Sequence, residues 1–436
     1  MVTFLVRRIT FLLITLVFVS IAIFMVTELA PGNIAVNTLG MTITPEQEAS
    51  FNAQNGLNEP ATTRYVRWLL GSDWRASNRI GRPVQRVRNG QGSLSWWVVA
   101  EDGTLFQTST DGEQLFRRVL IDPVETIFED EIIDSADAWT TNEQGVEVFW
   151  GIDHGNRGAM WVRGNVSEEL TLGPAGWQAS TGAPADYIPL QRGLLRGDPG
   201  FSLKDRAPVA EVLPRRAANT AILAGTAFVI VMPLALLLGL IAGLNEGKLI
   251  DRIFSISSLI ATATPEFASG VFLILIFTVW LGWFPGAVVI TSEDALFQNP
   301  DMLVLPILTL TLLELGYVLR ITRASMVEVM RTNYIRTAVL KGLPQRRIVF
   351  KHALRNALLA PITIIMLHVN WLIGGIVIVE TLFGFPGLGR YVLEAALFKD
   401  VFAIEASAML LVIIAVATQL GADVLYTFLN PRIRYS

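Results

Sequence analysis

The stretch that decides the fold is Ala217–Leu244, which reads AANTAILAGTAFVIVMPLALLLGLIAGL and contains no charged residue. A helix that crosses a lipid bilayer needs roughly 20 mostly apolar residues. This stretch is longer than that, so a helix formed by it can cross the bilayer with a tilt. Ala217–Leu244 therefore predicts a transmembrane helix.

Five other stretches share this apolar character: Ile9–Leu29, Ile253–Leu281, Met302–Leu319, Ala357–Val379 and Ile404–Leu429. Pro265 is expected to kink the helix that contains it, because proline has no N–H to donate one turn back. The composition agrees, since charged residues make up 17% of the chain and a soluble domain carries about a quarter. We expect an all-α polytopic membrane protein with six transmembrane helices.

The distribution of charge predicts the orientation of these helices. Arg7 and Arg8 precede the first stretch, which places the N-terminus in the cytoplasm by the positive-inside rule. Alternation places residues 320–355 inside too, and this loop has nine Lys and Arg residues against one acid, Glu328. Both termini are therefore expected in the cytoplasm. A cleaved signal peptide is the alternative for Ile9–Leu29, but no small-x-small cleavage site follows it.

Residues 31–213 are expected outside the cytoplasm, and they carry 24 Asp and Glu residues against 15 Lys and Arg residues. Asp102-Gly103 between two apolar runs is a hairpin signal, and Asp153–Asn156 marks a second candidate hairpin. Gln114–Ile121 and Glu125–Ile133 are expected to form a strand and a short helix. We expect a small β-rich domain here, between a first transmembrane helix (1–30) and a five-helix core (214–436).

The cytoplasmic loop contains Tyr334-Ile-Arg-Thr-Ala-Val-Leu-Lys-Gly342-Leu-Pro-Gln-Arg346. This segment resembles the coupling loop of type I ABC importer permeases, in the version carried by the dipeptide and oligopeptide permease family. The matching positions are Arg336, Thr337, Ala338, Lys341, Gly342, Leu343 and Arg346, within a loop of about 323–356. Further stretches match the same family in order: Glu28–Gly32, Gly56–Pro60, Tyr65–Trp68, Leu195–Ser202, Val379–Arg390 and Asn430–Arg432.

The resemblance implies the type I ABC importer permease fold in a bacterial or archaeal plasma membrane. It implies a second homologous permease, two cytoplasmic ATP-binding subunits that hold ATP and Mg²⁺, and an extracytoplasmic substrate-binding protein. Peptides are the expected solute, although similar permeases carry nickel complexes, glutathione, opines or oligosaccharides. The chain itself has no phosphate-binding loop, because Gly247-Lys248 lacks the preceding glycine and is followed by Leu249. We expect no cofactor, no metal and no catalytic residue in this chain.

One departure from the family pattern predicts an insertion. Tyr65–Gly71 and Leu195–Ser202 normally lie within a few residues of each other, but here more than a hundred residues separate them. The β-rich domain is therefore expected to be an insertion of about 72–192. Two interpretations stay open: a solvated decoration that stabilises the complex, or a docking surface or lid for a substrate-binding protein.

The coupling loop also makes physical sense without the family. Gly342-Leu-Pro344 ends a short helix, and apolar Val339, Leu340 and Leu343 can fill a groove in a partner. The alternative is that the cations of the loop only retain it inside and bind anionic lipid headgroups.

Polar residues within the apolar stretches are candidates for the translocation path, because charges are costly inside a bilayer. They are Glu314, His368 and Asn370, with Glu266 a weaker candidate. Interhelical hydrogen bonding is the alternative.

Gly239, Gly243 and Gly247 are spaced for close helix packing. The resemblance implies a short gating helix after the fifth span, with Glu380, Phe383 and Phe385 as candidate outer gate.

Other function classes fit less well. A membrane sensor would need a cytoplasmic signalling domain after its last span, and only seven residues follow Leu429. A membrane enzyme would need a nucleophile with its base or a metal cluster, but there is no cysteine, and His154 stands isolated outside the membrane. The charge distribution suggests a lipid membrane and protein partners, not nucleic acid.

Overall fold

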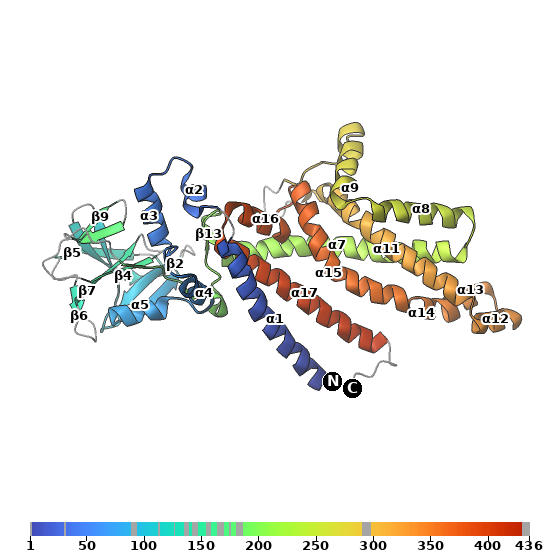
Figure 1. Ribbon diagram of the computed structural model, residues 1–436, viewed down its shortest axis with the longest axis horizontal. Coiled ribbons are helices and arrows are strands. Elements are labelled where there is room, and N and C mark those ends of the chain that lie inside the picture. Colours follow the sequence, from blue (N-terminus) through green and yellow to red (C-terminus); the bar gives the residue numbers. More distant parts are fainter. Residues whose placement is uncertain are drawn as a thin grey trace. The chain divides into compact units, whose positions relative to one another are not determined.

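The computed structural model describes residues 2–29, 32–88, 94–111, 114–125, 127–134, 139–141, 147–153, 158–163, 170–173, 176–179, 186–289 and 298–429. The chain divides into two compact units. The first, here called the helical unit, contains Met1–Ile23, Glu211–Leu397 and Ser407–Ser436. The second, here called the mixed unit, contains Phe24–Ala210 and Phe398–Ala406. Helices α1, α7, α16 and α17 each contribute residues to both units (Figure 1).

The helical unit is built from apolar helices and short connecting helices. The helices are α1 (Val2–Leu29), α7 (Val209–Leu244), α8 (Leu249–Ala263), α9 (Glu266–Leu273), the π-helix η2 (Ile274–Trp280), the 3₁₀-helix η3 (Pro300–Leu303), α11 (Val304–Met330), α12 (Asn333–Leu340), α13 (Gln345–Arg347), the π-helix η4 (Ile348–Ala353), α14 (Leu354–Ala357), α15 (Leu359–Leu382), α16 (Leu388–Phe398) and α17 (Val401–Leu429).

Four helices of the described residues are long and apolar enough to cross a membrane: Ile9–Leu29, Val209–Leu244, Pro300–Met330 and Val401–Gly421. Two further pairs of helices pass the same test together but are bent at a short break. They are Leu249–Ala263 with Glu266–Trp280, bent by 109°, and Gln345–Ala357 with Leu359–Met366, bent by 42°. The count is therefore four spans, or up to six if each bent pair is one span.

The break at Pro265 is sharper than the kink that the sequence predicts. Thr264 has an extended backbone (φ −88°, ψ 126°), the conformation that a following proline favours. Its N–H donates to the carbonyl of Ile260 and closes α8, and α9 starts afresh at Glu266. Ile253–Leu281 is therefore two helices with different directions, not one kinked helix.

Within the helical unit, α11 packs against α8, α9 and α15 (Figure 1). It also approaches α7 closely, because a Cβ at Gly239 would lie 2.5 Å from the Cβ of Thr322, and one at Gly243 would lie 2.8 Å from the Cβ of Met326. The predicted close packing at these two glycines is therefore confirmed. Gly247 is different: it has φ +78°, and a Cβ added to it would meet no atom within 4 Å, so it serves the turn before α8.

The mixed unit combines short helices with antiparallel strands. The helices are α2 (Ile34–Leu39), α3 (Pro45–Gln54), α4 (Ala61–Leu70), α5 (Asp73–Ile80) and the 3₁₀-helix η1 (Leu194–Arg196). The strands are β1 (Val84–Arg88), β2 (Leu94–Val99), β3 (Leu105–Asp111), β4 (Gln114–Asp122), β5 (Ile127–Ile132), β6 (Trp139–Thr141), β7 (Glu147–Asp153), β8 (Gly158–Arg163), β9 (Leu170–Gly173), β10 (Gly176–Ala179), β11 (Asp186–Ile188), β12 (Phe201–Ser202) and β13 (Ala207–Pro208).

The strands form a five-stranded sheet in the order β1-β2-β3-β4-β5, a four-stranded sheet in the order β11-β8-β7-β6, and two hairpins, β9–β10 and β12–β13. The predicted Asp-Gly turn joins β2 to β3, with Val98 opposite Phe106. Strands β7 and β8 pair as predicted, while the turn residues 154–157 between them, His154 included, lie outside the described residues. Residues 127–132 form a strand and not the expected helix, because they pair along the length of β4.

Candidate functional site

The coupling loop folds as a helical hairpin with one buried side. Helix α12 follows Thr332 and ends at Leu340, and Gly342 then takes φ +72° and donates its N–H to the carbonyl of Val339. This left-handed backbone favours glycine, which explains the residue at this turn. The buried side is a cluster of apolar residues: Met326, Ile335, Ala338, Ile348, Val349, Ala353 and Ala357.

The other side of the loop faces outward. Arg336, Thr337, Lys341 and Arg346 are all exposed. Val339 and Leu340 are 57% and 81% exposed, so two apolar side chains project from the end of α12. Leu343 does not join them, because it packs against the buried cluster, as Ala338 does. The loop therefore presents an apolar tip, Val339 and Leu340, together with the exposed cations Arg336, Lys341 and Arg346.

Two cations of the loop region pair with acids, one in the first turn of α8 and one in the turn between α7 and α8. Arg323 pairs with Asp251, through Nη2 at 2.8 Å and also through Nε, and Asp251 itself is 3% exposed. Asp251 further accepts the N–H of Gly247 at 2.9 Å. Arg331 pairs with Glu246 at 2.6 Å. These pairs fix the base of the loop, and they leave the cations of α12 and α13 exposed.

The candidates for the translocation path lie on three packed helices. Glu314 on α11 is 2% exposed, and it interacts electrostatically with Glu266, the first residue of α9. The Glu266 carboxylate lies against α15, because a Cβ at Gly375 would be 2.5 Å from its Oε1. The structure thus places Glu314 and Glu266, the weaker candidate, on two helices that pack against each other. His368 and Asn370 are on α15, and their side chains lie outside the described residues.

The candidate outer gate is a buried junction between α15 and α16. Glu380, Phe383 and Phe385 are each fully buried. The Glu380 carboxylate accepts a hydrogen bond from Thr220 Oγ1 at 2.5 Å and from the N–H of Arg390 at 2.9 Å. Because Arg390 lies in the first turn of α16, this carboxylate caps the helix at its positive end. Both phenylalanines belong to the main apolar core of the helical unit.

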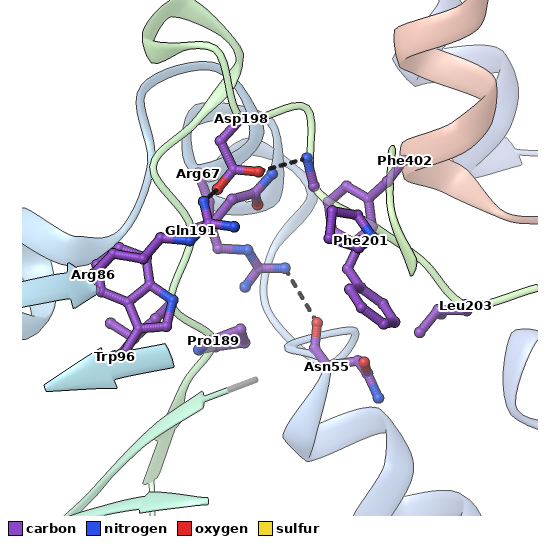
Figure 2. Close-up of a pocket in the computed structure, with 13 residues that line it drawn as sticks. Asn55, Arg67, Arg86, Trp96, Pro189, Gln191, Asp198, Phe201, Leu203 and Phe402 are labelled. Carbon is purple, nitrogen blue, oxygen red and sulfur yellow. Dashed lines mark hydrogen bonds and ion pairs between the residues drawn. The ribbon is translucent and has the colours of Figure 1, made fainter. Parts of the chain in front are cut away.

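The mixed unit contains a cavity of about 80 Å³ that sequence reasoning did not identify. Figure 2 shows Arg86 and Trp96 on one side of it and Phe201, Leu203 and Phe402 on the other, with Arg67 between them. The Arg86 guanidinium lies 5.8 Å from the ring centre of Trp96 and pairs with Asp198 at 2.6 Å. Asp198 also accepts the N–H groups of Arg192 and Gly200, each at 3.2 Å.

Arg67 is the most deeply buried cation of this cavity, at 4% exposed. Its Nη1 pairs with Glu59, and its Nη2 lies 3.3 Å from the carbonyl of Asn55 and 3.5 Å from that of Gly56. Burial lowers the pKa of Arg67, and the carboxylate of Glu59 opposes that shift. The signal for this residue in the sequence is an arginine between apolar Val66 and Trp68 in an otherwise amphipathic segment.

Within the described residues, no group of three or more His, Cys, Asp and Glu side chains is placed to hold a metal ion. The exposed tip of the coupling loop and the cavity of the mixed unit are two features of the described residues where a partner or a ligand could make contact.

Comparison with known proteins identifies the family. The profile described as "Binding-protein-dependent transport system inner membrane component" matches residues 235–435, and the profile of its N-terminal region matches residues 1–79. The oligopeptide transport system permease protein AppB of Bacillus subtilis (strain 168) is 34% identical over 252 residues, covering 57% of this chain and 80% of that protein. The glutathione transport system permease protein GsiC of Shigella flexneri serotype 5b is 35% identical over 241 residues, covering 55% and 76%.

A putative peptide transport system permease protein of Brucella abortus (strain 2308) is 34% identical over 242 residues, covering 56% of this chain and 77% of that protein. Among solved structures, an inward-facing MetNI methionine ABC transporter chain matches with a TM-score of 0.42 and 18% identity, covering 50% of this chain and 96% of that chain. The relatives show that this chain belongs to the family of inner membrane components of binding-protein-dependent transport systems, as a permease subunit of an ABC importer.

Proposed function

We propose that this permease forms half of a translocation path for peptides or similar small solutes. Relatives at 34% and 35% identity are named as oligopeptide, peptide and glutathione permeases, which supports this class of solute. The path is completed by a second homologous permease. Two cytoplasmic subunits bind ATP and Mg²⁺, and an extracytoplasmic binding protein delivers the solute.

In this proposal the chain has the type I permease fold, with six spans and both termini in the cytoplasm. The four apolar helices and the two bent pairs support that number, with each bent pair counted as one span. The excess of Lys and Arg in residues 320–355 supports the orientation. Glu314 and Glu266, with His368 and Asn370 on α15, line the path, and the junction at Glu380, Phe383 and Phe385 closes it on the outer side.

The exposed apolar tip of the loop is the observation that supports a role in coupling. Binding of anionic headgroups would account for the cations of the loop, but not for the exposed apolar pair Val339 and Leu340. An apolar tip within a polar rim is the usual anatomy of a protein interface. We propose that Val339 and Leu340 enter a groove of the ATP-binding subunit, and that Arg336, Lys341 and Arg346 surround that contact.

We also propose that residues 72–192 are an insertion. Its two ends are joined in the mixed unit: the N–H of Ser72 donates to the carbonyl of Gln191 at 2.8 Å, and the N–H of Gln191 donates to Ser72 Oγ at 3.0 Å. Arg196 also pairs with Asp73. The two family profiles end at residue 79 and resume at residue 235, so all strands from β1 to β13 fall between them.

A docking surface for the binding protein is the interpretation that the sheet favours. Strand β5 is at the edge of the five-stranded sheet, and all six of its residues are exposed. Ile121, Val124 and Ile132 are exposed at or near this edge together with the acids Glu129 and Glu131. An exposed apolar edge is a liability for a mere solvated decoration, whereas a partner would cover it.

The coupling role is tested with the variant Leu340→Asp. Because Leu340 is 81% exposed, the change leaves the loop folded but places a charge in the proposed groove. We expect the tagged chain, purified from its own membrane, to lose its ATP-binding subunits and its solute-stimulated ATP hydrolysis. Leu195→Asp is the matched control, since Leu195 is 69% exposed but lies in the mixed unit. Retention of the ATP-binding subunits by Leu340→Asp would contradict the proposal.

A further inference from the structure

The cavity of the mixed unit is bordered by hydrogen-bond donors that lack an acceptor. The side-chain nitrogen Nε2 of Gln191 and the Nε of Arg86 are both buried and have no hydrogen-bond partner among the described residues. Within the described part of the chain, the Nη2 of Arg67 has two carbonyl contacts, at 3.3 and 3.5 Å, which are at or beyond the usual length of an N–H···O bond. Buried polar groups without partners are rare and costly, so these donors need an explanation.

The missing partner is an acceptor and carries negative charge. Among the described lining residues, Arg67 and Arg86 are the two cations and Asp198 is the one acid; Glu59, which pairs with Nη1 of Arg67, does not line the cavity. Asp198 is already occupied by Arg86 and two backbone N–H groups. A carboxylate fits this surplus of donors, because its two oxygens accept several hydrogen bonds and pair well with guanidinium groups.

The opposite wall of the cavity and the cavity volume indicate the chemistry and the size of the part of the ligand beyond the carboxylate. Phe201, Leu203 and Phe402 form an apolar surface there, as Figure 2 shows. A cavity of about 80 Å³ is well above the roughly 10–15 Å³ that one water molecule needs in this measure, so it has room for about five to eight waters. A ligand of about that many non-hydrogen atoms is a small molecule or the end of a larger one.

We propose that this cavity binds a carboxylate group that carries a short apolar chain, with Arg67, Arg86 and Gln191 on the carboxylate and the phenylalanines on the chain. Two sources share this chemistry: a free small carboxylic acid, and the C-terminal residue of a peptide. Arg86 and Gln191 belong to residues 72–192, whereas Arg67 precedes them, so an occupied cavity would join the insertion to the rest of the mixed unit. The inference does not depend on the coupling role of the loop.

Propionate and propionamide are the probes, since they share size and shape but differ in charge. The full-length chain in lipid nanodiscs is examined by saturation-transfer NMR with each compound. We expect a saturable signal from propionate and a much weaker one from propionamide. Equal signals, or none from propionate, would overturn the proposal and leave the cavity to water.

A second experiment identifies the source of the carboxylate. If the dipeptide Ala-Ala displaces propionate but Ala-Ala amide does not, the source is a peptide terminus. If Ala-Ala does not displace propionate, the source is a free acid.

The matched variants are Gln191→Glu and Gln85→Glu. The first replaces the unpartnered donor with a carboxylate facing the ligand, and we expect about tenfold weaker propionate binding because a charge-assisted hydrogen bond is replaced by repulsion. Gln85 is exposed, lies one residue from Arg86 on β1 and does not line the cavity, so its variant should bind as the natural chain does. Undiminished binding by a folded Gln191→Glu chain would contradict the assignment of this donor. If that variant fails to fold, the comparison of propionate with propionamide on the natural chain still tests whether the cavity binds a carboxylate.

Discussion

At the scale of single residues, the turn at Gly342 depends on one backbone angle. A Cβ there would meet no atom within 4 Å, so steric contact with other residues does not require glycine. The φ of +72° does, because this region costs other residues about 1–2 kcal/mol. We therefore expect Gly342→Ala to weaken retention of the ATP-binding subunits by about fivefold to thirtyfold, the factor that corresponds to this cost.

Gly342→Asn is the control for this prediction, since asparagine adopts the left-handed region more readily than alanine. It should restore most of the retention, measured as the amount of ATP-binding subunit that copurifies with the tagged chain. If alanine and asparagine behave alike, a cause other than the backbone angle is responsible.

The role of a residue could be predicted from the sequence only where its immediate neighbours along the chain determine that role. The glycine and proline of Gly342-Leu-Pro344 predict the turn, but not that Leu343 packs inward while Leu340 projects. That difference depends on helices α7 and α11, which lie against one side of the loop. The cavity at Arg67 and Gln191 was missed for the same reason, because these residues are 124 positions apart and are joined only by the fold.

At the scale of elements, we predict that the close contact of α7 with α11 requires a glycine at position 239. Gly239→Ala would place a Cβ 2.5 Å from the Cβ of Thr322 and 2.7 Å from the carbonyl oxygen of Leu319. Overpacking of this kind costs about 1–3 kcal/mol, so the melting temperature of the purified chain should fall. Gly225→Ala is the control on the same helix, because nothing lies within 4 Å of its Cβ, and alanine is a better helix former. An equal fall for both variants would contradict the proposed close contact.

The helices and strands show which structural features could be predicted from periodicity and composition. Long apolar stretches and the Asp-Gly hairpin were recognisable, because both signals are local. The sharp break at Pro265 and the strand at 127–132 were not, since a proline allows either a kink or a break, and β4 supplies the pairing that turns Ile127–Ile132 into a strand. The strand at 127–132 is thus a case in which a tertiary partner decides between local alternatives.

At the scale of the whole molecule, the proposed orientation is testable by labelling, because the chain contains no cysteine. A single cysteine at Glu101, whose side chain is 92% exposed, should react with a membrane-impermeant maleimide added outside intact cells. A single cysteine at Lys341, exposed in the coupling loop, should react only after the membrane is permeabilised. Reaction of both positions from the same side would contradict six spans with this orientation.

The last prediction concerns the proposed insertion of residues 72–192. The backbones of Gly71 and Gly193 meet, because a Cβ at Gly193 would clash with the backbone of Gly71, so residues 72–192 can be replaced by a two-glycine linker. The helical unit holds the coupling loop and its apolar cluster without any residue of this segment. The shortened chain should therefore enter the membrane and retain its ATP-binding subunits. Its uptake of solute should fall, because the proposed docking surface for the binding protein is gone. Loss of the ATP-binding subunits would show that the segment is part of the core and not an insertion, while full uptake would show that it decorates the complex.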